Sequence, residues 1–161
     1  MVFRITQRLA KKINIKSIKN YEQKVSAFEE WYANLFNVGR YKYILITNAY
    51  SLYSVIISAK GINDGKSLVS EFNDQLLTTM KKDNLRFLIN RFSIKNNTTI
   101  DFCKTSSKRI LGSMNDMTFL CSYRISETMD LLEASRIINK TPFSYLNYQS
   151  PLDVIQNMSL S

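Results

Sequence analysis

Short apolar runs separated by polar turns fill the first third of the chain, and this spacing is typical of β-strands. Val2–Thr6 predicts a first strand. Residues 41–47 and 52–58 form two further runs rich in β-branched and aromatic side chains, with a turn at 48–51 between them. Because strands joined by a short turn usually pair with each other, these runs predict an antiparallel meander.

The chain around the first strand is less regular. Thr6 can cap a short helix that ends near Ile13. Asn20 and Gln23 resemble a capping box, which predicts that a helical stretch follows them. The run 31–36 alternates like a strand, yet the same residues also fit a continued helix. We favour the strand.

The second half of the chain carries apolar residues at helical spacing. Ser67 is the expected cap of the first long helix, and Lys81 and Lys82 suit its carboxyl end. A last strand is expected at 98–103, preceded by a turn at Asn96 and Asn97. The predicted helices are, in order, 67–82, 85–92, 107–125, 127–139 and 152–158.

Together these elements predict an α+β fold with a helical C-terminal half. We expect an antiparallel sheet of about four or five strands, with the helices packed on one of its faces. The 161 residues suit a single globular domain over 1–158, followed by a short loose tail at 159–161.

The composition removes several kinds of chemistry. Because the chain has no histidine, it holds no Ser-His-Asp or Cys-His arrangement and no histidine-based zinc site. It also lacks the glycine-rich loops that cradle nucleotide phosphates. Its two cysteines, Cys103 and Cys121, have no metal-ligand spacing and are expected to be buried, reduced thiols. The sequence therefore favours a non-catalytic protein without cofactor or metal.

The apolar runs are far too short to span a membrane, and the cysteine usage suits a reducing compartment. We therefore expect a soluble, cytoplasmic protein with no membrane partner. The net charge of +9 is concentrated in two basic segments, 4–24 and 81–109. Such clusters attract nucleic acid or an acidic protein, although lysine-rich composition can also arise without any anionic partner.

Several polar residues lie in one segment. It comprises the end of the last strand, a short loop and the start of the 107–125 helix. A helix beginning next to cations is a natural seat for an anion. The candidate ligand-binding residues are Lys104, Thr105, Ser106, Arg109, Gly112, Ser113, Asn115 and Asp116. The alternative is structural: a serine caps the helix, Gly112 allows a neighbouring strand to pack closely, and Arg109 pairs with Asp116 on the surface.

A second, weaker group lies on the predicted meander. Trp31, Asn34 and Asn48 are candidates for polar or aromatic contacts on the surface. Trp31 fits a buried core position better than a stacking platform. Asn48 fits a turn residue that tolerates the left-handed conformation.

Four strings distributed over nearly the whole chain carry a resemblance. They are Trp31–Phe36, Thr47–Asn48, Lys104–Thr105 with Leu111–Asp116, and Thr141–Ser144. Together they resemble an uncharacterised bacterial domain family of unknown function, which is sometimes joined to plasmid open-reading-frame domains. The resemblance implies a one-domain architecture and assigns no activity.

Three functional hypotheses remain open from the sequence. The first is a non-catalytic interaction or regulatory module, associated with a mobile element, that docks an acidic partner. The second is a nucleic-acid-binding protein that uses the basic segments 4–24 and 81–109. The third is a small-anion binder or an enzyme centred on Lys104–Asp116.

Overall fold

The computed structural model describes residues 1–20, 23–26, 28–92, 94–95, 98–128 and 130–158. Five strands form one sheet in the order β4-β3-β2-β1-β5. They are β1 (Val2–Ile5), β2 (Glu30–Val38), β3 (Tyr41–Asn48), β4 (Ser54–Ser58) and β5 (Asp101–Lys104). The expected tail at 159–161 and the expected turn at 96–97 lie outside the described residues.

The sheet is mixed rather than antiparallel throughout. The predicted meander is confirmed, because β2 pairs antiparallel with β3 and β3 pairs antiparallel with β4. The strand β1, however, lies between β2 and β5 and runs parallel to both of these neighbours. Strands that pair in parallel need a long crossover, and the helix after β1 begins the crossover to β2. The 31–36 run lies inside β2, so it is a strand.

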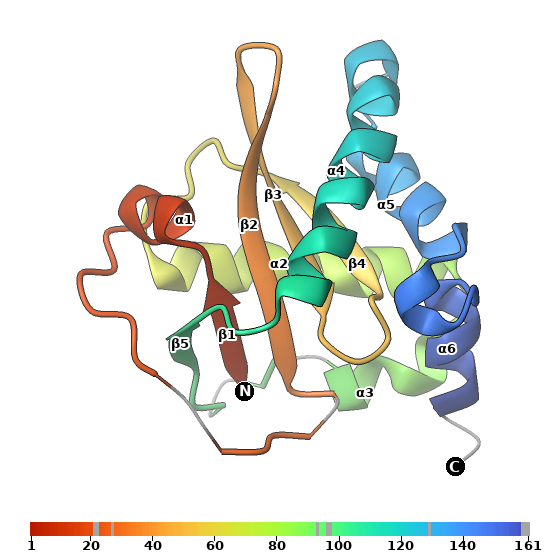
Figure 1. Ribbon diagram of the computed structural model, residues 1–161, viewed down its shortest axis with the longest axis horizontal. Coiled ribbons are helices and arrows are strands. Elements are labelled where there is room, and N and C mark those ends of the chain that lie inside the picture. The colour runs from red at the N-terminus through yellow and green to blue at the C-terminus, as the bar shows by residue number, and fades with distance from the viewer. Residues whose placement is uncertain (21–22, 27, 93, 96–97, 129, 159–161) are drawn as a thin grey trace.

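Helices account for most of the rest of the chain (Figure 1). They are α1 (Gln7–Lys12), α2 (Gly65–Lys82), α3 (Ile89–Phe92), α4 (Lys108–Thr128), α5 (Leu131–Lys140) and α6 (Pro151–Met158). Short 3-10 turns lie at Arg86–Leu88 and Ser144–Leu146. The α+β class and the helical C-terminal half are therefore confirmed.

The helices cover both faces of the sheet, and the expectation of a single covered face is wrong. On β3, Ile44 and Ile46 belong to one apolar core with α1 and α2, whereas Tyr43 and Leu45 belong to another with α4 and α5. Successive side chains of a strand point to opposite faces, so a continuous apolar run needs a cover on each side. The protein therefore has three layers: the sheet lies in the middle, with α1 and α2 on one face and α4 and α5 on the other.

Several helix boundaries differ from expectation. Thr6 caps α1 as predicted, but α2 is capped by Asp64, and Ser67 serves instead as the third residue of the capping box. No helix forms at the described positions within 20–28. The last long helices divide at Asp130, which caps α5, and not at Glu127, which lies inside α4.

Side chains of α5 protect the exposed edge of the sheet at β4. Asn139 accepts a hydrogen bond from the Ser54 N–H at 2.7 Å, and its amide donates to the Ser54 carbonyl at 2.9 Å. The Ser135 hydroxyl accepts from the Ile56 N–H at 3.0 Å. Asn139 and Ser135 are fully buried. Because an unpaired edge strand can recruit a further strand, these contacts substitute for the missing neighbour.

A buried polar group joins the end of α2 to α5. Asp83 accepts a hydrogen bond from the Tyr53 hydroxyl at 2.7 Å and from Arg136 Nε at 2.9 Å. Burial, reinforced by the neighbouring carboxylate, raises the pKa of Tyr53 above its ordinary value. Tyr53 therefore remains a hydroxyl donor at neutral pH, and both Asp83 oxygens have partners.

Candidate functional site

The start of α4 is satisfied by the protein's own side chains. The Ser107 hydroxyl accepts from the Ile110 N–H at 3.2 Å, so Ser107 is the N-terminal cap. The Ser107 N–H itself donates to the Tyr32 hydroxyl at 3.2 Å, and Tyr32 also contacts the Ser106 hydroxyl at 3.0 Å. The N–H groups of Ser107 and Ile110 therefore both have side-chain acceptors within the protein, an arrangement typical of a capped helix start.

The other predicted residues of that segment do not gather around the loop. A Cβ added at Gly112 would meet no atom within 4 Å, so no neighbouring strand packs against it. Arg109 lies over the Tyr145 ring at 5.2 Å, and within the described chain it forms no ion pair with Asp116. Asn115 and Asp116 are exposed on α4. The candidate site divides into a loop group near Tyr32 and a helix group farther along α4.

Residues proposed as surface contacts on the meander are mostly internal. Trp31 is fully buried, packs edge-to-face on Phe72 at 4.8 Å, and leaves its indole N–H without a partner among the described residues. Asn48 is also buried, and its side-chain oxygen accepts the Ser51 N–H at 3.0 Å. Asn48 is thus a turn residue, although the left-handed conformation falls on Leu52 instead.

Asn34 is half-buried on β2, where its side-chain oxygen contacts the Thr6 hydroxyl at 3.1 Å. This contact ties β2 to the start of α1. Trp31, Asn34 and Asn48 therefore make contacts within the fold, and they do not come together on one exposed surface.

Both cysteines are free and buried, and burial raises the pKa of each thiol, that of Cys121 to about 12. Since the thiolate is the reactive form, we expect both thiols in the folded protein to react with a chromogenic disulfide reagent at pH 8 at least about 100-fold more slowly than in denaturant. Absorbance of the released thiol measures the rate. Fast labelling of either cysteine in the native protein would contradict this expectation.

The sequence's two basic segments meet beside α1. A depression of about 250 Å³ is lined by Lys11 and Lys16 from the first segment and by Lys104 from the second. Its other lining residues carry no carboxylate. The fold therefore unites cations that are almost ninety positions apart in the chain.

A second depression, of about 640 Å³, lies between the end of α1, the β2–β3 hairpin and the start of α5. Four cations line it: Lys12, Arg40, Lys42 and Lys60. No carboxylate is among its lining residues, and Tyr41 presents a half-exposed ring beside Arg40.

We call the cations of these two depressions, together with Arg8, the α1 band. Its members are Arg8, Lys11, Lys12, Lys16, Arg40, Lys42, Lys60 and Lys104. Arg8 joins the group because it donates to Asn37 at the hairpin at 3.0 Å. In the part of the chain that the structure describes, none of these cations forms a salt bridge. Asp64, close in sequence to Lys60, is used to cap α2.

Other predicted cations lie elsewhere. Arg4 is buried, pairs with Glu30 and donates to the Lys104 carbonyl. Lys81 and Lys82 end α2, and Arg91 lies over the Phe28 ring near α3. Figure 1 places α3 at the lower right of the molecule and α1 at the left. Segments 4–24 and 81–109 are therefore not one continuous surface.

Sequence reasoning missed three members of the α1 band: Arg40, Lys42 and Lys60. They lie outside the two basic segments, because β2 separates α1 from Arg40 and Lys42 in sequence, and β2, β3 and β4 separate it from Lys60. A signal was nevertheless present, since Arg40 and Lys42 flank Tyr41 at the start of a predicted strand without any nearby acidic residue.

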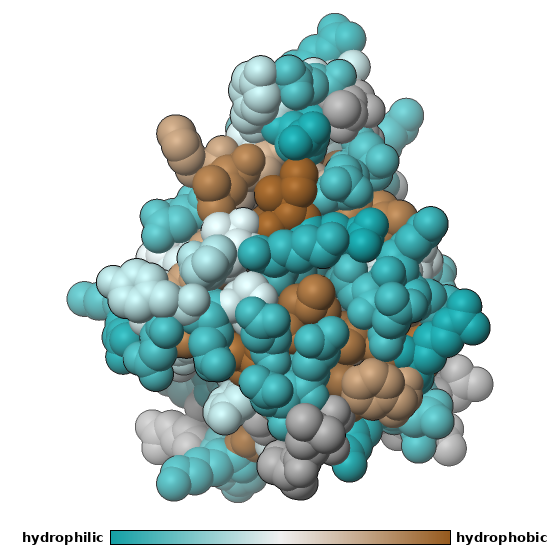
Figure 2. Space-filling view, turned by 90° about the vertical axis from the view of Figure 1, so that its right-hand side faces the viewer, coloured by the Kyte–Doolittle hydropathy of each residue, from teal (hydrophilic) through white to brown (hydrophobic). Residues whose placement is uncertain are grey.

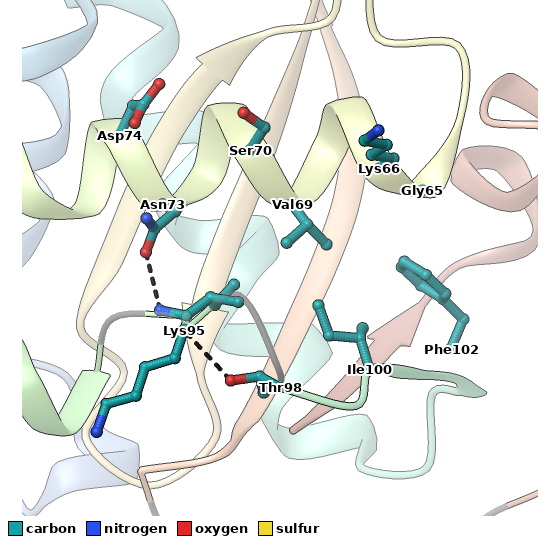
Figure 3. A pocket seen from close by; sticks show the side chains of 11 residues that line it. Gly65, Lys66, Val69, Ser70, Asn73, Asp74, Lys95, Thr98, Ile100 and Phe102 are labelled. Atoms are coloured by element: carbon teal, nitrogen blue, oxygen red, sulfur yellow. Dashed lines mark hydrogen bonds between the residues drawn. The ribbon is translucent and has the colours of Figure 1, made fainter.

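A third pocket, of about 440 Å³, separates α2 from the segment 94–102 (Figure 3). Val69 points from α2 toward Ile100, and the Asn73 side-chain oxygen accepts the Ile94 N–H at 2.9 Å. A Cβ at Gly65 would lie 2.8 Å from the Phe102 ring, so any larger residue there would force that ring to shift. These contacts anchor the segment to the helix.

Over the described residues, no three His, Cys, Asp or Glu side chains come close enough together to hold a metal ion. None of the helices there has the length and apolar character needed to cross a bilayer.

Comparison with known proteins gives one match. The model of a family described as a domain of unknown function, DUF6933, matches residues 2–154. No curated protein and no solved structure matches the chain significantly.

Proposed function

We propose that this chain, which belongs to the DUF6933 family of domains of unknown function, is a non-catalytic binding module whose α1 band holds nucleic-acid phosphates. The observation that carries the proposal is the set of eight cations around α1 that have no carboxylate partner in the described chain. Cations left unpaired on one surface raise the local potential and favour a polyanion.

The shape of the band supports a long ligand over a small one. Its cations come from α1, the β2–β3 hairpin, the loop at Lys60 and the end of β5, so one phosphate cannot contact them all. A nucleic-acid backbone offers phosphates at regular spacing over such a distance. Tyr41 adds an exposed ring on which an unpaired base can stack.

The start of α4 supports a small-anion site less well. Two of the backbone N–H groups there, those of Ser107 and Ile110, already donate to the Tyr32 and Ser107 hydroxyls.

The proposal predicts steeply salt-dependent binding. Fluorescence anisotropy with labelled duplex and single-stranded DNA and RNA should give a plot of log affinity against log salt with a slope between about −3 and −7, as expected for four to eight phosphate contacts. The double variant Lys42→Glu/Lys60→Glu should weaken binding at least about ten-fold and reduce that slope by about 2.

The matched control is Lys81→Glu/Lys82→Glu, which changes the net charge equally but lies at the end of α2, away from the band. It should change affinity by less than about three-fold, since only long-range charge is altered. If both double variants lost affinity equally, the loss would reflect net charge alone and not contacts made by the α1 band. Failure to bind any of the four nucleic acids at low salt would refute the proposal.

A further inference from the structure

The outer face of α4 exposes large apolar side chains that no other described part of the chain covers. Phe119 is 84% exposed, Tyr123 is 69% exposed, and Leu120 lies between them. Phe119 and Leu120 border a depression of about 410 Å³ that residues from 141 to 148 line on its other side. Figure 2, a view from the right-hand side of Figure 1, shows hydrophobic side chains exposed among polar ones.

The charged residues at the two ends of α4 are placed unfavourably with respect to the dipole of the helix. Lys108 and Arg109 lie in the first turn of α4, and Glu127 lies in the last. Cations at the amino end and an anion at the carboxyl end both oppose the helix dipole. A second helix alongside in the antiparallel direction would reverse this penalty, because each end would meet the opposite charge.

The spacing of these residues makes the face complementary to itself. Arg109 and Glu127 are 18 positions apart in the sequence, which is five helical turns, so both lie on one line along the helix. A two-fold axis that crosses the outer face of α4 at the height of residue 118 would bring Arg109 of one copy to the partner's Glu127. The same axis brings Tyr123 of each copy to the partner's Ser113.

Gly112 provides the space for this approach. It is an exposed glycine inside a helix, a placement that costs about 1 kcal/mol relative to alanine. A Cβ there would meet no atom within 4 Å in the single chain. The gap beside Ser113 can therefore accept the ring of the partner's Tyr123.

We propose that α4 pairs antiparallel with α4 of a second copy of this chain to form a two-fold symmetric dimer. The exposed rings form the apolar centre, and the Arg109–Glu127 pairs close both ends. This inference uses a different surface from the α1 band and does not depend on nucleic-acid binding.

Sedimentation equilibrium of the full chain without nucleic acid tests the proposal. The wild-type chain should be dimeric, and Phe119→Ser or Tyr123→Ser should weaken dimerisation at least about ten-fold. Gly112→Leu should do the same while leaving the thermal midpoint undiminished, because it improves helix propensity but fills the gap. This variant separates loss of the interface from loss of the fold.

A charge exchange tests the direction of the pairing. Arg109→Glu and Glu127→Arg should each weaken the dimer, and the double variant should restore it to within about three-fold of wild type. The matched control is Phe87→Ser, which removes another exposed ring, one that lies outside α4, and should leave the association unchanged. A wild-type chain that stays monomeric, or a double variant that does not restore the dimer, overturns the proposal.

Discussion

Replacing Arg136 by methionine is expected to lower the free energy of unfolding by roughly 3–5 kcal/mol. Asp83 is the reason, because its side chain is only 1% exposed and Arg136 is its only cationic partner in the described chain. Methionine keeps most of the apolar stem but leaves the carboxylate buried beside the Tyr53 hydroxyl alone. Water cannot compensate at that position, so most of the desolvation cost remains.

Urea unfolding followed by circular dichroism measures this loss. The triple variant Arg136→Met/Asp83→Leu/Tyr53→Phe is the control, because it removes the whole polar group rather than one partner. It should recover most of the stability, since apolar replacements of a complete buried pair are often neutral. A single variant as stable as wild type would show that Asp83 does not depend on the guanidinium.

Replacing Asn139 by leucine is expected to cost about 2–4 kcal/mol. The substitution leaves the Ser54 N–H and carbonyl without partners at a fully buried position on the edge strand β4. Ser135→Ala removes a single acceptor, that of the Ile56 N–H, and should cost about 1–2 kcal/mol. Denaturant unfolding at equal protein concentrations compares the two variants.

The control for these substitutions is Asn115→Ala. Asn115 is an exposed asparagine on a helix, so its replacement should change stability by less than about 0.5 kcal/mol. Light scattering adds a second measurement, because an edge strand without its α5 contacts is a template for aggregation. An Asn139→Leu variant that unfolds like the Asn115→Ala control would contradict the assignment of Asn139 as the edge partner of β4.

Local signals predicted several elements well. Thr6 caps α1 as expected, because capping depends only on a hydroxyl three positions before a free N–H. On α4, the apolar positions that share one face at helical spacing are all buried: Ile110, Met114, Met117 and Cys121. The meander was also predictable, since its strands are joined by short turns.

Boundaries decided by competing caps were harder to predict. Asp64 and Ser67 are both good capping residues, and the structure uses both in one capping box. At the other end of the chain, α4 and α5 divide near Asp130 rather than at Glu127, because the Asp130 side chain accepts the Glu133 N–H at 3.0 Å. Sequence alone offers several such hydroxyls and carboxylates and no means to rank them.

The start of α4 combines one contact that the sequence indicates and one that it does not. Ser107 caps α4, as one interpretation of the sequence required. The second contact, from Tyr32, joins positions 75 residues apart and cannot be deduced from spacing. It gives the Ser107 N–H an acceptor from a distant strand.

By itself the sequence determined the α+β class, the meander, the long helices and the excess of positive charge. These follow from local periodicity, propensity and composition, which act over a few residues. Only the tertiary structure decided that β1 lies between β2 and β5 and runs parallel to both, that helices cover both faces, and that Lys104 joins Lys11 and Lys16. The physical reason is that such contacts depend on how buried faces of distant segments fit together, and no local pattern records that fit.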